Sequence, residues 1–267
     1  VTLLASAGAL LLSGPFGLGV YILANRFAVS TVQRLALVAM LVGVWPFLFL
    51  SVVAFEAMVF LAFWGFGFVQ IEPAPSDMLF MALLAIGLFR GKLSLKALKP
   101  LPVVHLALWG VVVGNLLSLL VGGFYLKGLR FAAITFYLIA FFYFTKMYIT
   151  SRKRMRWVLM AYLASAATTM FLVVLGYMRI GPAPRLFLGW GIRAKGFFKD
   201  PNLLGPFLNL MILWLLDETL RPTFIPRFSW LKQVGVMVFS LGVLFSFSRA
   251  SWMEWALSIM VYFALAR

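Results

Sequence analysis

Long apolar runs separated by short polar loops fill the sequence from residue 78 onward. Clear runs cover 78–89, 101–122, 131–149, 157–177, 203–216, 233–248 and 250–266. A transmembrane helix needs about 20 mostly apolar residues, whereas the strands of a membrane barrel appear as short segments of alternating polarity. The pattern therefore predicts an all-α fold, a polytopic transmembrane helical bundle of roughly nine or ten spans over the whole chain.

The N-terminal part is less regular. Residues 35–71 contain Pro46 and Glu56 and, as one helix, would extend about 55 Å against an apolar bilayer core of about 30 Å. A helical hairpin and a single span followed by an interfacial helix both satisfy the pattern. The number of spans within residues 1–75 stays open.

No segment is polar enough to fold as a separate soluble domain. We therefore expect residues 1–267 to form a single transmembrane domain, with its core in residues 76–267. Val1 is not a methionine and Arg267 follows an apolar run directly, so we expect the chain to be truncated at its C-terminus, either as a fragment of a longer protein or as a copy that lacks this part.

Composition agrees with the helix pattern. Hydrophobic residues make up 64% of the chain and charged residues 11%, whereas soluble domains contain about 25% charged residues. With no cysteine, one histidine and seven carboxylates, we expect no metal site and no cofactor. The net charge of +16 is interpreted as a bias of basic loops toward anionic lipid headgroups, so membrane lipids and not nucleic acid are the expected partners.

Basic loops predict the orientation. The densest is Ser151–Arg156, with Lys146 just before it, and the positive-inside rule places it in the cytoplasm. Counting spans from this loop puts 90–99 and 217–232 on the same side, which then holds twelve Lys and Arg residues against eight opposite.

The opposite face nevertheless carries one unexpectedly basic loop, residues 178–200. It contains Arg179, Arg185, Arg193, Lys195 and Lys199. A bound anion would compensate this charge; the alternative is a solvated loop whose charge is incidental.

A helix start follows this loop directly. Asp200 is suited to the N-cap, Pro201 fits the first turn, and Asn202 comes next. The N–H groups and the positive dipole end of that helix would face outward, as in sites that bind anions.

Arg249, in "SFSRASW", stands almost alone between two apolar runs. An arginine at the bilayer centre costs at least about 2.5–3.5 kcal/mol, so this one should lie at an interface or in a polar cavity. Two crossings separate it from the 191–202 segment, which places both on the outer face. The alternative interpretation is a snorkelling interfacial arginine.

Three features inside the runs have structural interpretations. The segment Gly110–Gly114 is typical of a close helix contact. His105 is expected to be a satisfied side chain near the cytoplasmic end of its span. Glu254 could pair with a neighbouring basic group, and Asp77 is expected to cap the helix after "EPAPSD".

The two arginine segments resemble a known family. "RAKGFFKDPNLLGPFL" (193–208) is similar to the Arg–Gly–Phe–Pro-Asn signature of the O-antigen ligase and O-antigen polymerase superfamily, and "SFSRASW" (246–252) to its following Ser-Arg helix start. "QIEPAPSDMLFMALLAIGLF" (70–89) resembles an Asp-led span of the same family. The resemblance covers about residues 70–260.

This resemblance implies a metal-independent glycosyltransferase in the bacterial inner membrane, with its site facing the periplasm or cell exterior. It would move a glycan from an undecaprenyl-diphosphate carrier to an acceptor glycan or lipid, as a polymerase or a ligase of cell-envelope polysaccharide. The diphosphate would be held by Arg193 and Arg249, assisted by Lys195 and Lys199. The family's acceptor-activating histidine has no counterpart, because His105 lies elsewhere; no catalytic residue is assigned, and we expect poor transfer.

Two other classes remain open. A transporter or flippase for an anionic lipid would also place a helix N-terminus at an anion, but should show a second Pro-broken helix beside a basic loop. Pro15 and Pro46 are the candidates and neither has such a loop. The third class is a membrane scaffold whose outer charge is incidental.

Overall fold

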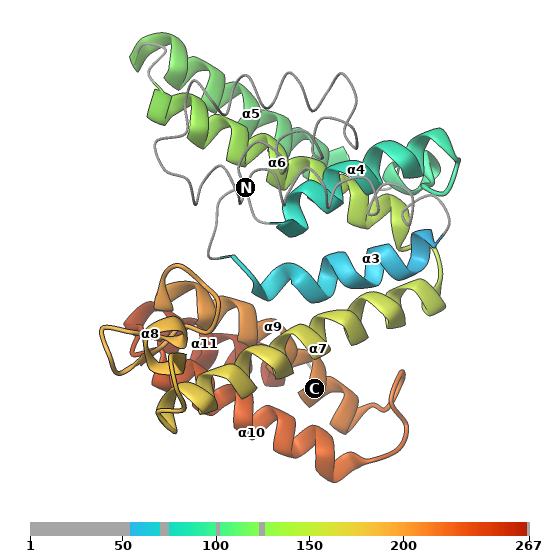
Figure 1. The fold of residues 1–267 in the computed structure, drawn as a ribbon. Helices are drawn as coiled ribbons and strands as arrows, with labels where there is room; N and C mark the ends of the chain where they lie inside the picture. The colour runs from blue at the N-terminus through green and yellow to red at the C-terminus, as the bar shows by residue number, and fades with distance from the viewer. Residues whose placement is uncertain (1–53, 70–74, 100–101, 123–125, 266–267) are drawn as a thin grey trace, which may run out of the picture.

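The computed structural model describes residues 54–69, 75–99, 102–122 and 126–265, and helices dominate it (Figure 1). The α-helices are α3 (Phe55–Trp64), α4 (Pro75–Phe89), α5 (Pro102–Gly122), α6 (Leu126–Tyr148), α7 (Arg152–Tyr177), α8 (Ala183–Phe187), α9 (Leu204–Leu220), α10 (Ser229–Phe245) and α11 (Arg249–Leu265). Short 3-10 turns are η1 (Gly65–Gly67), η2 (Leu95–Leu98) and η3 (Pro201–Leu203), and one small hairpin pairs β1 (Leu188–Gly189) with β2 (Arg193–Ala194).

The predicted all-helical fold is confirmed for this part of the chain, and each predicted apolar run coincides with a helix. Four segments are long and apolar enough to cross a membrane: Pro102–Gly122, Phe131–Tyr148, Arg152–Tyr177 and Pro201–Leu220. The apolar helices Phe55–Gly67, Leu79–Phe89 and Ser229–Phe245 are shorter. Nine or ten spans are therefore not confirmed within the described residues, and Pro15 and Pro46 lie outside them.

Helix α7 lies between two groups of helices (Figure 1). On one side its first half packs with α3, α4 and α6 around the buried aromatic side chains Phe63, Phe80 and Phe144. On the other side its second half packs with α9 and α10 around Met170 and Leu208. These two apolar clusters hold the described helices together.

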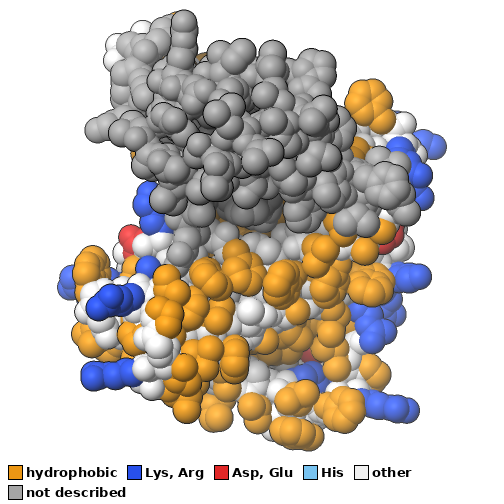
Figure 2. All heavy atoms as spheres, in the orientation of Figure 1, with side chains coloured by type: hydrophobic (Ala, Val, Ile, Leu, Met, Phe, Trp, Pro, Cys, Tyr) orange, Lys and Arg blue, Asp and Glu red, His pale blue; other side chains and the backbone are white. Residues whose placement is uncertain are grey.

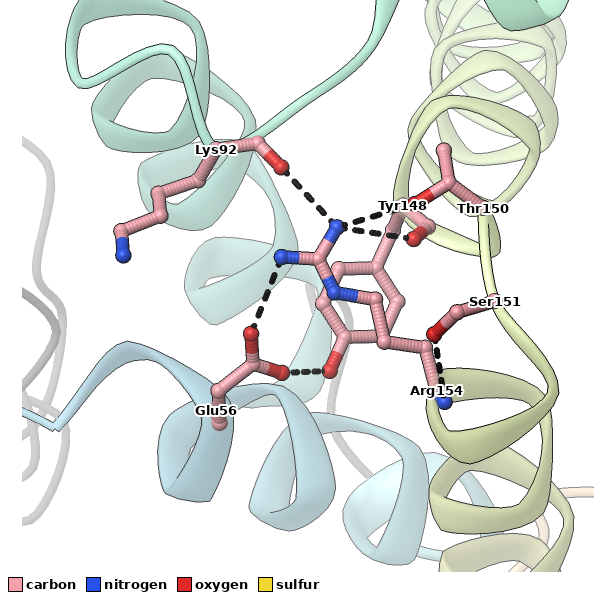
Figure 3. Close-up of polar contacts among 6 residues, drawn as sticks. All are labelled: Glu56, Lys92, Tyr148, Thr150, Ser151 and Arg154. Atoms are coloured by element: carbon pink, nitrogen blue, oxygen red, sulfur yellow. Dashed lines mark hydrogen bonds and ion pairs between the residues drawn. The ribbon is translucent and has the colours of Figure 1, made fainter.

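Arg154, near the start of α7, joins the loops at one end of the helices (Figure 3). Its Nη1 donates to the carbonyl oxygen of Lys92 at 3.2 Å, and its Nη2 donates to Oε1 of Glu56 at 3.1 Å. The hydroxyl of Tyr148 donates to the other oxygen of Glu56. The end of the molecule that carries this cluster is called the basic end below.

The loop after α9 reaches the same place. Arg152 donates to the carbonyl oxygen of Thr223 at 3.3 Å, and its guanidinium lies 5.4 Å from the ring centroid of Phe224. Loops 90–99, 146–156 and 217–232 are thus in contact, as span counting predicted. The opposite end, with loop 178–200, is called the site end.

Helices α3 and α4 form a pair that is too short to cross a membrane and returns to the end of the molecule where it begins. Arg154 touches Glu56 in the first turn of α3 and Lys92 just after α4, so both outer ends of the pair lie at the basic end. Helix α3 has 10 residues and η1 adds 3, so together they extend roughly 20 Å. Helix α4 has 15 residues and extends roughly 22 Å. Both lengths are less than the apolar bilayer core of about 30 Å. At the inner end, Gly67 N–H donates to Ser165 Oγ at 3.0 Å, near the middle of α7.

This pair corrects the interpretation of 78–89 as a separate span. The run 78–89 is as apolar as a membrane-spanning helix, but the helix that it forms, α4, returns to the basic end, where α3 begins. Asp77 is also not the N-cap, because α4 begins at Pro75 and Asp77 lies within its first turn.

The other sequence interpretations have mixed outcomes. His105 is satisfied as predicted, with Nδ1 3.1 Å from the Tyr143 hydroxyl and Nε2 2.6 Å from the Leu98 carbonyl oxygen. The close helix contact predicted at Gly110 and Gly114 is not made with the described residues, since none of their atoms lies within 4 Å of a Cβ built at either glycine.

Replacing Arg154 with alanine should lower the thermal stability of the protein in detergent. The variant loses the contacts that join α3, α4 and α6 to α7, and we expect a loss of roughly 1–2 kcal/mol, discounted because the Glu56 side chain is 53% exposed. The matched control is Lys153→Ala, because Lys153 is exposed and has no partner among the described residues. An equal fall in melting temperature for both variants would contradict this role.

Candidate functional site

The 3-10 turn η3, which leads directly into α9, has the predicted cap. Asp200 has an extended backbone (φ −126°, ψ 132°), and its carboxylate accepts the N–H of Asn202 at 2.8 Å. Pro201 occupies the first helical position, where its missing N–H costs nothing. The local sequence alone therefore fixes where this helix begins.

A tight hairpin precedes the cap. Strands β1 and β2 are antiparallel, with Gly189 opposite Arg193, and Ile192 N–H donates to the Gly189 carbonyl at 3.3 Å. The two central residues, Trp190 (φ 48°) and Gly191 (φ 78°), both have positive φ, as in a type I′ turn. A left-handed backbone suits glycine but costs a residue such as tryptophan about 1–2 kcal/mol.

Arg193 connects this hairpin to two other segments. Its Nε donates to the carbonyl oxygen of Ser246 at 2.7 Å, and its Nη2 donates to Oδ1 of Asn202 at 2.8 Å. Its guanidinium carbon lies 4.9 Å from the centre of the Trp190 ring. One side chain therefore joins the hairpin, the start of α9 and the turn after α10, and its other N–H groups remain for a ligand.

That turn leads directly to Arg249. Ser246 ends α10 and Arg249 is the first residue of α11, so the contact to Ser246 brings the two arginine segments into one region, as expected. Ser251 N–H donates to Ser248 Oγ at 3.3 Å, which fixes the start of α11. Arg249 itself is exposed and makes no hydrogen bond or ion pair with the described residues.

The two predicted lysines are held differently. Lys195 is half-buried, and its backbone N–H donates to the Phe187 carbonyl at 3.1 Å. Lys199 is exposed and directly precedes Asp200. Their assistance to the arginines stays a prediction.

Polar residues continue from the site along the contact of α9 with α11. Gly205 packs so closely that a Cβ there would lie 2.2 Å from the Cβ of Ser251. Further along, Nδ2 of Asn209 donates to Ser258 Oγ at 2.9 Å and lies 3.4 Å from Glu254 Oε1. This row of contacts is called the polar seam.

The polar seam corrects one expectation and adds residues that sequence reasoning missed. Glu254 pairs with the amide of Asn209 and not with a basic group. Asn209 is 4% exposed, and its Oδ1 has no hydrogen-bond partner among the described residues. Gly205 follows Asn202 by three residues, and Asn209 follows Asn202 by seven. This spacing places the three residues on one helix face, so the sequence did contain a signal for the polar seam.

Charge is distributed toward both ends of the described helices. Figure 2 shows Lys and Arg side chains toward both edges of the view, with hydrophobic side chains between them. Within the part of the chain that the structure describes, no group of three His, Cys, Asp or Glu side chains could hold a metal ion.

Comparison of the chain with protein-family models, with curated proteins and with solved structures finds no match. The described residues define an α-helical protein with four helices long and apolar enough to span a membrane. At one end of the helices, Arg193 joins a basic loop to two other segments.

Replacing Gly205 with alanine should force α9 and α11 apart and lower the melting temperature, at a cost of about 1–3 kcal/mol for overpacking. Adding Ser251→Gly should restore part of the loss, because it removes the atoms that the new Cβ would meet. The control is Gly110→Ala, where a Cβ meets no described atom. If the second substitution restores nothing, the proposed close contact is wrong.

Proposed function

We propose that this chain is a bacterial inner-membrane protein that binds the diphosphate of a lipid-linked glycan at the outer face. It would be the donor-binding part of a glycosyltransferase of the O-antigen ligase or polymerase type. The observation that carries the proposal is the contact of Arg193 with Ser246 and Asn202, which joins both arginine segments at the start of α9.

The chemistry of the site favours a phosphate-bearing ligand. Both acceptors of Arg193 are neutral oxygens, so its positive charge is not neutralised by them. Arg249 is exposed beside the same turn. Guanidinium groups bind phosphate oxygens through paired hydrogen bonds.

The same groups would assist transfer of the glycan. When the glycosidic bond to the carrier breaks, the leaving diphosphate gains negative charge. Contacts to that charge strengthen toward the transition state and so lower the barrier. Lys195 and Lys199 would contribute as point charges.

Sidedness supports the outer face. Three basic loops meet at the basic end, which the positive-inside rule assigns to the cytoplasm. The segment Pro201–Leu220 has 20 residues, or about 30 Å as a helix, and so separates the two ends by roughly the thickness of an apolar bilayer core. His105, the chain's single histidine, is bound at the basic end, so we propose donor binding with poor transfer.

Single cysteines test the sidedness directly, since the chain has none. Lys153→Cys and Lys195→Cys should react with a membrane-impermeant thiol reagent from opposite sides of intact cells or oriented vesicles. Lys153 lies in the first turn of α7, and Lys195 lies in the loop beyond the other end of α7, directly after β2. Labelling of both from one side would overturn the assigned orientation.

Binding of a short-chain polyprenyl diphosphate tests the donor site. Arg249→Ala should weaken binding about tenfold or more, the scale of one charged phosphate contact, without lowering the melting temperature. Arg193→Lys should weaken binding and also lower the melting temperature, because lysine cannot make both of the contacts to Ser246 and Asn202.

The matched control is Arg185→Ala. Arg185 is exposed at the same end of the protein and has no partner among the described residues, so its loss removes the same charge away from the site. Arg249→Ala with the affinity of the unaltered protein, or with no more effect than Arg185→Ala, excludes this donor site.

A further inference from the structure

Trp190 is the feature at the site end that diphosphate binding leaves unexplained. It lies at the tip of the hairpin and is 80% exposed. The guanidinium of Arg193 lies over its ring, 4.9 Å from the ring centre. An indole so exposed gains little from burial.

The turn does not require a tryptophan. A type I′ turn favours asparagine or glycine at its central positions, because both tolerate positive φ. Trp190 has a φ of 48°, so the chain accepts backbone strain in order to present this ring. Backbone strain of this kind indicates that the indole has a use other than forming the turn.

Support of Arg193 does not supply that use. The guanidinium is already fixed by the carbonyl of Ser246 and the amide oxygen of Asn202. The hairpin is also fixed without the indole, since the hydroxyl of Tyr177 at the end of α7 donates to the Ile192 carbonyl at 2.5 Å. The ring is therefore a flat, exposed surface beside a positioned phosphate-binding group.

We propose that Trp190 stacks on the sugar residue joined directly to the carrier diphosphate. One face of a pyranose ring presents C–H groups with partial positive charge, which suit the electron-rich face of an indole. A diphosphate bound at Arg193 would carry this sugar next to Trp190. The inference rests on the proposed function and names the part of the donor that the site would recognise.

The experiment compares two probes, a short-chain polyprenyl diphosphate alone and the same lipid bearing one N-acetylglucosamine. The unaltered protein should bind the sugar-bearing lipid about five- to tenfold more tightly than the bare lipid. Trp190→Asn should abolish this difference and leave the affinity for the bare lipid unchanged. Asparagine fits the positive φ, so this variant should fold.

Trp190→Tyr should keep part of the preference, because it keeps an aromatic face. The matched control is Trp230→Ala, which removes a tryptophan that is 64% exposed at the other end of the helices, at the start of α10. It should keep the full preference for the sugar-bearing lipid.

The outcomes separate this inference from the proposed function. A sugar preference that Trp190→Asn leaves intact overturns the stacking role alone. An equal loss of affinity for both lipids also overturns it, and indicates that the indole supports Arg193 or anchors the hairpin at the membrane interface. Binding of the bare lipid that does not depend on Arg249 overturns the proposed function, and the stacking role with it.

Discussion

The arrangement of the site end depends on the guanidinium of Arg193. This group holds the hairpin, the start of α9 and the α10–α11 turn through two short hydrogen bonds. Both acceptors are neutral, so the bonds fix the position of the charge without compensating it. A carboxylate partner would have given a stronger bond and a weaker anion site. Because both acceptors are neutral, Arg193 can hold these segments together and still carry a charge that attracts an anion.

At the basic end, one arginine is paired with a carboxylate. Arg154 pairs with Glu56 (Figure 3), and Lys232, which is buried, donates to the backbone carbonyls of Glu218 and Ile225. The carboxylate of Glu218 accepts three backbone N–H groups, those of Thr223, Phe224 and Ile225. Glu56 compensates the charge of Arg154, whereas Lys232, like Arg193, donates to neutral carbonyl oxygens; both groups stabilise loops. The two ends thus differ in what their basic residues contact, which net charge alone does not reveal.

Much of this arrangement could be predicted because it follows from local rules. Apolar runs determine the helices, Asp200-Pro201 determines the start of α9, and the grouping of the basic loops follows from counting spans. The rest depends on contacts between distant residues. The run 78–89 is as apolar as a span, and only the bonds of Arg154 show that α4 turns back. The partner of Glu254 likewise depends on the close approach at Gly205, which no single segment encodes.

The proposed donor binding and the proposed glycan transfer would need different groups. Of the groups assigned to the diphosphate, Arg193 is positioned by hydrogen bonds that exist without a ligand, so binding need not order Arg193 or the hairpin. Activation of an acceptor needs a base beside the sugar, and His105 is bound at the other end of the helices. Glu254 is the carboxylate that the polar seam connects to the face of α9 carrying Asn202. Among the described residues Glu254 pairs with an amide and not with a cation, and it follows Arg249 by five residues on α11.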